Sequence, residues 1–230
     1  MVHYSHFKAR SNKSKKNFIL LHGFGGGQGD YLFYISKLRD FGNVYLLSLP
    51  GHDKNIMPVD RESYAISDIN HEFFPTKSDN IIFVAHSIAS IFFSESFLNE
   101  YKSRIDKVFL ISPVSFSSFV SNLNDYSNSL SPLMQRIESN LDNFPSFKTL
   151  EKINKGRFLN IYKGLFKEFL LNFKDNNYQK SSKVKIIWGD DDELIQPSSF
   201  DLVDLQLTGC GHNCHIQSPS HIINFITGQK

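Results

Sequence analysis

The stretch over residues 81–89 constrains the fold of this chain more than any other. Residues 81–85, Ile-Ile-Phe-Val-Ala, form a continuous apolar run rich in β-branched and aromatic side chains. Such a run indicates a strand that is buried on both faces, as the strands of helix-covered parallel sheets are. The chain then turns at His86-Ser87, and residues 88–100 have the pattern of a helix. This stretch therefore predicts the centre of an α/β sheet.

Ser87 lies at the predicted strand-to-helix turn, with Ala85 and Ala89 two residues away on either side. This spacing fits a nucleophile elbow, a tight turn that projects a serine above the sheet and tolerates only very small neighbours. The usual G-x-S-x-G pattern here has alanine in place of both glycines. The motif is weak by itself, so its interpretation depends on the rest of the chain.

Other apolar runs alternate with helical patterns along the chain. Strands are predicted over residues 2–9, 18–21, 44–47, 108–111, 184–188 and 202–207, and helices around 31–38 and 219–226. This alternation predicts one α/β domain over residues 1–230, with a mostly parallel, doubly wound sheet covered by helices on both faces. Sites in such sheets lie beyond the carboxyl ends of strands. His22, Ser87, Asp192 and His212 all follow predicted strands, which favours a catalytic centre there.

The alternation breaks between residues 114 and 182, where we expect a helical cap inserted into the sheet domain. Within it, apolar side chains recur at helical spacing and include Phe158, Tyr162 and Leu165. An apolar face of this kind packs on a core, and in a cap the same face also roofs a pocket. We assign these three residues to the substrate pocket.

Charge and cysteine content exclude several classes of function. The formal net charge is only +2, so nothing indicates a nucleic-acid partner. No apolar segment reaches membrane-spanning length or follows the N-terminal charges as a signal peptide would. Two cysteines are too few to cross-link a domain of this size, so a cytoplasmic protein is expected. The segment from Cys210 to His215 lacks the second ligand pair that zinc sites use, so no metal is expected.

Several short motifs occur in a consistent order at the predicted strand ends. They are Leu20-Leu21-His22-Gly23-Phe24-Gly25-Gly26, Leu49-Pro50-Gly51-His52, the turn at Ser87, Trp188-Gly189-Asp190-Asp191-Asp192, and Gly209-Cys210-Gly211-His212. In this order, over nearly the whole chain, they resemble the α/β-hydrolase superfamily, and most closely its compact capped esterases and lipases.

The resemblance implies a nucleophile at Ser87, an acid at Asp192 and a base at His212, in the chain order that this fold uses. A serine hydroxyl must give its proton to a base as it attacks, and histidine suits that task. A carboxylate on the far ring nitrogen holds the imidazole in the correct tautomer. His215 is the alternative base, and Asp191 is the alternative acid within a run of three aspartates.

The same resemblance implies an oxyanion hole made by the backbone N–H groups of Phe24 and Ile88, with His22, Gly23 and His86 beside the pocket. The expected activity is hydrolysis of a small-molecule carboxylic ester or thioester with a short to medium apolar acyl group, without a cofactor. The alternatives are an inactive hydrolase-like protein that binds a small apolar ligand, and a C–C bond hydrolase or lyase on the same fold. The sequence does not distinguish a monomer from a dimer.

Overall fold

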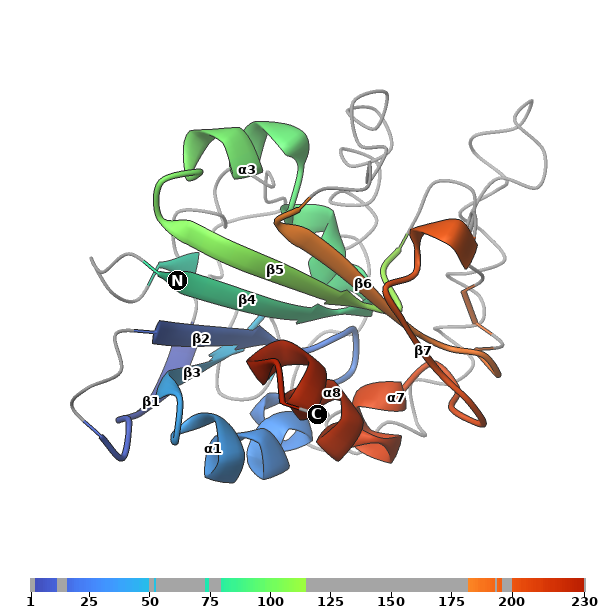
Figure 1. Ribbon diagram of the computed structural model, residues 1–230, viewed down its shortest axis with the longest axis horizontal. Coiled ribbons are helices and arrows are strands. Elements are labelled where there is room, and N and C mark those ends of the chain that lie inside the picture. The colour runs from blue at the N-terminus through green and yellow to red at the C-terminus, as the bar shows by residue number, and fades with distance from the viewer. Residues whose placement is uncertain are drawn as a thin grey trace.

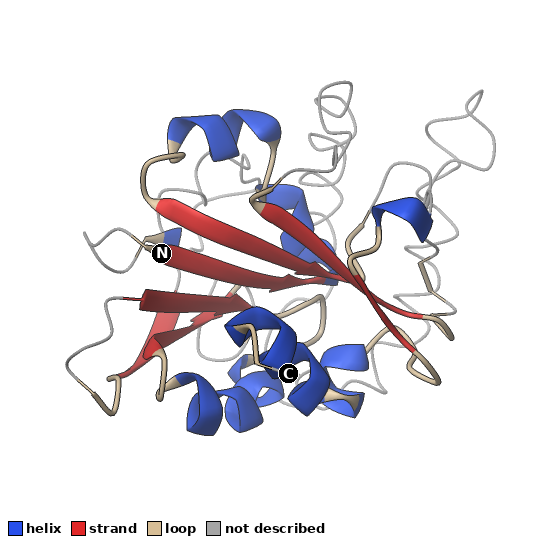
Figure 2. Ribbon diagram, in the orientation of Figure 1, coloured by secondary structure: helices blue, strands red, loops and turns tan. Residues whose placement is uncertain are grey.

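The computed structural model describes residues 3–11, 16–49, 52, 73–74, 80–114, 182–192, 194–195 and 200–229. Seven strands within these ranges form one sheet in the order β1-β3-β2-β4-β5-β6-β7. The strands are β1 (His3–Phe7), β2 (Lys16–Leu21), β3 (Gly42–Ser48), β4 (Ile81–His86), β5 (Ile105–Ile111), β6 (Val184–Gly189) and β7 (Leu205–Leu207). Only the edge strand β1 is antiparallel to its neighbour, which confirms the predicted mostly parallel sheet (Figure 2).

Helices cover both faces of this sheet (Figure 1). The longer helices are α1 (Leu32–Leu38), α3 (Glu95–Glu100) and α8 (Pro219–Thr227), and a single turn, α7 (Cys214–Gln217), precedes α8. Along β2, Phe18 and Leu20 pack in the layer with α1 and α8, whereas Ile19 and Leu21 pack in the layer with α3. All four side chains are completely buried. Burial of alternate side chains in two separate cores confirms the doubly wound architecture.

The predicted cap over residues 114–182 lies outside the described residues, apart from its end positions, and so do Phe158, Tyr162 and Leu165. The domain boundaries therefore remain a prediction. Among the described helices, none combines the length and the apolar character needed to cross a membrane.

The segment after β4 differs from the single helix predicted over residues 88–100. A 3₁₀ helix spans Ser87–Phe92, the chain leaves helical geometry at Phe93 and Ser94, and α3 starts at Glu95. The backbone of Ser94 is extended, and its hydroxyl accepts a hydrogen bond from the Phe97 N–H at 3.2 Å. Serine is a favourable N-cap because it satisfies a helix-start N–H in this way. The prediction of a continuous helix was wrong because the apolar spacing persists across this cap.

The strand register brings the chemistry-bearing segments to one edge of the sheet. Leu21 of β2 lies opposite Ala85 of β4, and Ile111 of β5 lies opposite Ile187 of β6. The carboxyl ends of these parallel strands therefore meet, and the segments that follow β2, β4 and β6 start from the same edge.

Candidate active site

The turn at Ser87 is strained. β4 ends at His86, and Ser87 follows with φ +52°, a left-handed conformation that non-glycine residues seldom adopt. Ala85 and Ala89 are completely buried on either side, so alanine fits the space that glycine occupies in the usual pattern. Backbone strain of this kind persists only where the surrounding structure holds it, and it concentrates at functional sites.

A hydrogen-bonded chain of three side chains starts at this serine. The Ser87 hydroxyl lies 2.9 Å from Nε2 of His212, and Nδ1 of His212 lies 2.9 Å from Oδ2 of Asp192. The Asp192 side chain is completely buried and that of His212 is 12% exposed. The structure thus brings together the three residues that the sequence singled out, from the ends of β4 and β6 and from the loop after β7.

The two alternative residues, Asp191 for the acid and His215 for the base, lie outside this hydrogen-bonded chain. Asp191 is exposed, and its backbone N–H donates to the Cys210 carbonyl at 2.9 Å. His215 is buried in α7, and within the described part of the chain neither of its ring nitrogens has a hydrogen-bond partner. Neither residue takes part in the hydrogen-bonded chain from Ser87.

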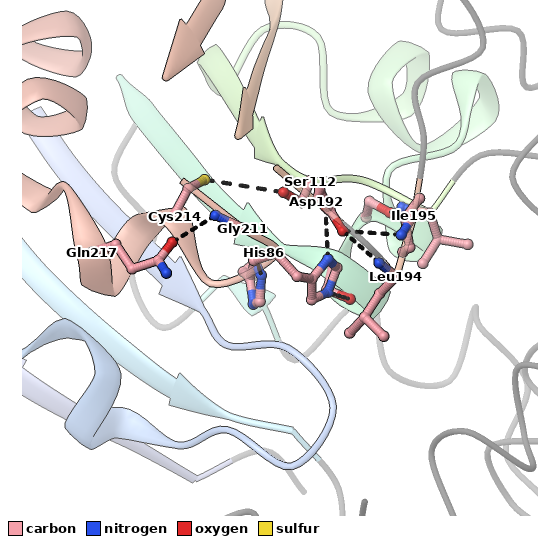
Figure 3. A network of polar contacts seen from close by, with 12 residues as sticks. His86, Ser112, Asp192, Leu194, Ile195, Gly211, Cys214 and Gln217 are labelled. Carbon is pink, nitrogen blue, oxygen red and sulfur yellow. Dashed lines mark hydrogen bonds and ion pairs between the residues drawn. The ribbon is translucent and has the colours of Figure 1, made fainter. Parts of the chain in front are cut away.

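The turn after β6 fixes the Asp192 carboxylate. Its Oδ1 accepts hydrogen bonds from the backbone N–H groups of Leu194 and Ile195, both at 3.0 Å. Figure 3 shows Asp192 with Leu194 and Ile195 in this network. The other oxygen, Oδ2, is left as the partner of His212. The two backbone donors orient the carboxylate, which makes one of its oxygens the partner of the imidazole.

The loop that carries His212 is anchored from both sides. The Gln217 side chain accepts the Gly211 N–H at 2.8 Å (Figure 3). On the other side Gly189 packs on the loop backbone, where a Cβ atom would lie 2.2 Å from the Cys210 carbonyl oxygen. The Gln217 contact was not predictable from the sequence, because a side-chain to backbone hydrogen bond across a loop follows no residue pattern.

Gly189→Ala tests this close approach. Because the clash is with backbone, it cannot be relieved by a side-chain rotation, and we expect the free energy of unfolding to fall by about 1–3 kcal/mol. Gly29→Ala is the matched control, since a Cβ there meets nothing within 4 Å. Urea unfolding of the two variants should show a loss for the first and a change within about 0.5 kcal/mol for the second. Equal stability of the two variants would contradict the packing described for Gly189.

The predicted oxyanion turn after β2 is held by two buried histidines. His22 accepts the Leu49 N–H at Nε2 (3.0 Å) and donates from Nδ1 to the Gly23 carbonyl (2.7 Å). Nε2 of His52 accepts the Gly25 N–H at 3.0 Å. Both rings are completely buried, so these contacts fix the backbone of the turn. The sequence predicted His22 beside the pocket, and the structure places it under this turn.

The predicted oxyanion turn contacts the turn at Ser87 through Gly23. A Cβ atom on Gly23 would lie 3.1 Å from Cβ of Ser87. Phe24 follows Gly23 on one of these segments, and Ile88 follows Ser87 on the other. Ile88 lies in the first turn of the 3₁₀ helix, where backbone N–H groups have no partner within the helix. The two backbone groups expected to form the oxyanion hole thus lie on segments that meet at Ser87.

A second layer of histidines lies behind His212. The His86 ring contacts the His212 carbonyl through Nε2 at 2.9 Å and packs against the His215 ring, with the centroids 4.0 Å apart and the ring planes tilted by 36°. Burial, with the nearby charges of His212 and His22, lowers the pKa of His215 to about 3. Burial lowers the pKa of His86 well below its usual value, and the electrostatic effects of the nearby His215 and His212 lower it further. Both rings are therefore neutral near pH 7.

These two buried histidines make stability depend on pH. In the unfolded chain they protonate near pH 6.5, whereas the folded protein keeps them neutral to lower pH, so the unfolded state binds more protons between about pH 6.5 and 3. We expect the free energy of unfolding to have its full value above pH 7, where both histidines are neutral in the folded and unfolded states. It should fall by about 2–4 kcal/mol between pH 7 and pH 5. Urea unfolding at pH 7, 6 and 5 measures this slope. His215→Phe should reduce it, and an unchanged slope in that variant would contradict the neutral buried His215.

Among the described residues, no group of three or more His, Cys, Asp or Glu side chains is arranged to hold a metal ion. Cys210 and Cys214 are both buried free thiols. Cys214 lies 4.0 Å from the Ser112 hydroxyl (Figure 3), and burial raises the pKa of its thiol to about 12.

Comparison with known proteins gives structural relatives only. No protein-family model matches the sequence, and no curated protein sequence matches it either. Solved structures match over 99% of this chain. An alpha/beta hydrolase fold protein from Burkholderia ambifaria has a TM-score of 0.70 at 14% identity, with 94% of its chain covered.

Two further similar structures are enzymes. One comes from work on carboxylesterases of the thaumarchaeon Nitrososphaera gargenis, with a TM-score of 0.57, 17% identity and 93% of that chain covered. The other is a laboratory-evolved variant of potato epoxide hydrolase, with a TM-score of 0.69, 14% identity and 94% covered. The chain therefore has the α/β-hydrolase fold, as its sequence motifs predicted.

Proposed function

We propose that this protein is a serine hydrolase that cleaves carboxylic esters or thioesters with a short to medium apolar acyl group. The observation that carries the proposal is the continuous hydrogen-bonded chain from Ser87 through His212 to Asp192, with both contacts at 2.9 Å. A hydroxyl on a strained elbow, a base within reach of it and a carboxylate on the far side of that base are the parts that acyl transfer needs.

The reaction has two halves. Ser87 Oγ attacks the carbonyl carbon while His212 Nε2 takes the hydroxyl proton, and the same proton then passes to the departing alcohol or thiol. Water next attacks the acyl-enzyme, with His212 as its base, and releases the acid and the free serine. Asp192 accepts from Nδ1–H of His212 throughout, which keeps Nε2 unprotonated at the start and stabilises the imidazolium that forms.

The negative oxygen of the tetrahedral intermediate is assigned to the backbone N–H groups of Phe24 and Ile88. The contact between Gly23 and the Cβ of Ser87 supports this assignment, because it brings the two segments together at the nucleophile residue. One such donor contributes about 3–4 kcal/mol of transition-state stabilisation. Phe158, Tyr162 and Leu165 remain the proposed pocket residues for an apolar acyl chain.

Serine as the elbow residue favours ester substrates over epoxides, although structures of both kinds of hydrolase are similar to this one. Attack of Ser87 on an ester gives an acyl-enzyme, which is itself an ester that water cleaves. Attack on an epoxide would give an alkyl ether on the serine, which has no carbonyl carbon for water to attack, so the enzyme would not turn over.

A substrate panel tests this proposal. We expect the protein to release p-nitrophenolate from esters ranging from acetate to long acyl chains, with an optimum at short to medium length and no turnover of p-nitrostyrene oxide. Thioesters of the preferred acyl group should also be cleaved. Absence of turnover on every ester and thioester would contradict the proposal and favour a ligand-binding protein on the same fold.

A further inference from the structure

We infer that His86, the residue before Ser87, is a positioning residue that holds the oxyanion turn and the loop of His212 at a fixed separation. This inference rests on the proposed function, since it concerns the geometry of the same site. The His86 ring contacts three separate segments of the chain: the His212 loop, the turn at Gly23 and helix α7.

The first contact defines which nitrogen of the His86 ring carries the proton. Nε2 of His86 lies 2.9 Å from the His212 carbonyl oxygen. A carbonyl oxygen only accepts hydrogen bonds, so Nε2 carries the proton and, in the neutral ring, Nδ1 carries the lone pair. Burial beside His215, His212 and His22 lowers the pKa of His86, which keeps the ring neutral at the pH where His212 must act as a base.

The second and third contacts fix the ring in place. A Cβ atom on Gly23 would come within 2.5 Å of His86 Nδ1 and 3.0 Å of its Cε1, so the ring lies directly against this glycine. On another side the ring packs against the tilted ring of His215 at a centroid distance of 4.0 Å. With only 4% of the residue exposed, the ring is enclosed and has little freedom to change rotamer.

This arrangement couples the nucleophile to its base. His86 and Ser87 are consecutive residues of one strained turn, and one of them binds the backbone of His212 while the other meets its side chain. The hydrogen bond from His86 therefore ties the backbone of the base to the elbow that presents the nucleophile. Without it the His212 loop can shift, and a misplacement of about 1 Å can lower the rate about a hundredfold.

The same substitution at the two neighbouring histidines, His86 and His215, isolates the contribution of the hydrogen bond. His86→Phe keeps an aromatic ring but loses the donor, so we expect kcat for ester hydrolysis to fall about ten- to hundredfold with KM within about threefold. His215→Phe makes the same change in size where the ring nitrogens have no partner among the described residues, and kcat should stay within about threefold. His86→Gln, whose amide N–H also donates, should recover most of the loss.

Two outcomes in this series would overturn the inference: full kcat in His86→Phe, or equal losses in His86→Phe and His86→Gln. Thermal unfolding of each variant checks that it folds.

A long-range ¹H–¹⁵N spectrum of the wild-type imidazoles requires no turnover and keeps the inference testable if a variant does not fold. It should show His86 as a neutral ring protonated at Nε2, and a ring protonated at Nδ1 would contradict the inference. Absence of ester turnover in the wild type would refute the proposed function, and the spectrum would still decide the His86 contact.

Discussion

Ser87→Ala should lower kcat for ester hydrolysis by about 10⁵- to 10⁶-fold. The variant keeps His212 and the backbone N–H groups but has no oxygen to form the acyl-enzyme, so only uncatalysed attack by water within the site remains. Initial rates with the best p-nitrophenyl ester of the panel, measured at high enzyme concentration, give the ratio. Activity within about tenfold of the wild type would mean that the elbow is not the site of reaction.

Ser87→Gly is the matched control for the strained backbone. Alanine at φ +52° is disfavoured as serine is, whereas glycine adopts this conformation readily. Both variants should be inactive, but Ser87→Gly should be more stable than Ser87→Ala by about 1 kcal/mol. Urea unfolding separates them, and the opposite order of stability would contradict the strain assigned to the elbow.

Asp192→Asn should lower kcat about 10⁴-fold through the tautomer of His212. The N–H groups of Leu194 and Ile195 require an oxygen at the position of Oδ1, so the amide NH₂ of asparagine must face His212. Nδ1 of His212 then accepts, its proton moves to Nε2, and the nitrogen beside Ser87 can no longer take the hydroxyl proton.

Asp191→Asn is the control for this substitution. Asp191 is exposed and contacts the Cys210 carbonyl only through its backbone N–H in the bonds described for it, so kcat should stay within about twofold. Steady-state rates on one ester compare the two variants directly. A loss of similar size in both would mean that the acidic turn acts through its total charge rather than through one carboxylate.

The buried strands were predictable because two-sided burial leaves continuous apolar runs in the sequence. Ile81 to Ala85 and Phe18 to Leu21 have that pattern, and both lie in the sheet as predicted. The break at Phe93 and Ser94 was not predictable from apolar spacing, because the spacing continues across the N-cap.

The choice among three consecutive aspartates depends on turn geometry that composition does not encode. Asp190 accepts the Gly209 N–H at 2.7 Å, Asp191 is exposed, and Asp192 points inward to His212. The choice between His212 and His215 also depends on local structure. His215 lies on the short helix α7, where its ring packs against His86 and makes no contact with the Ser87 hydroxyl in the bonds described for it. The motif order identified the segments that the structure brings together, and the structure was needed to place the side chains within them.

Trapping the acyl-enzyme tests the central claim most directly. The protein would be mixed with excess p-nitrophenyl butyrate, quenched in acid within the first turnovers, digested, and analysed by mass spectrometry. We expect the peptide that contains Ser87 to gain the mass of one butyryl group, with the modification on Ser87 itself and none in Ser87→Ala. Release of p-nitrophenolate without an adduct on Ser87, or with an adduct on another residue, would contradict the proposed mechanism.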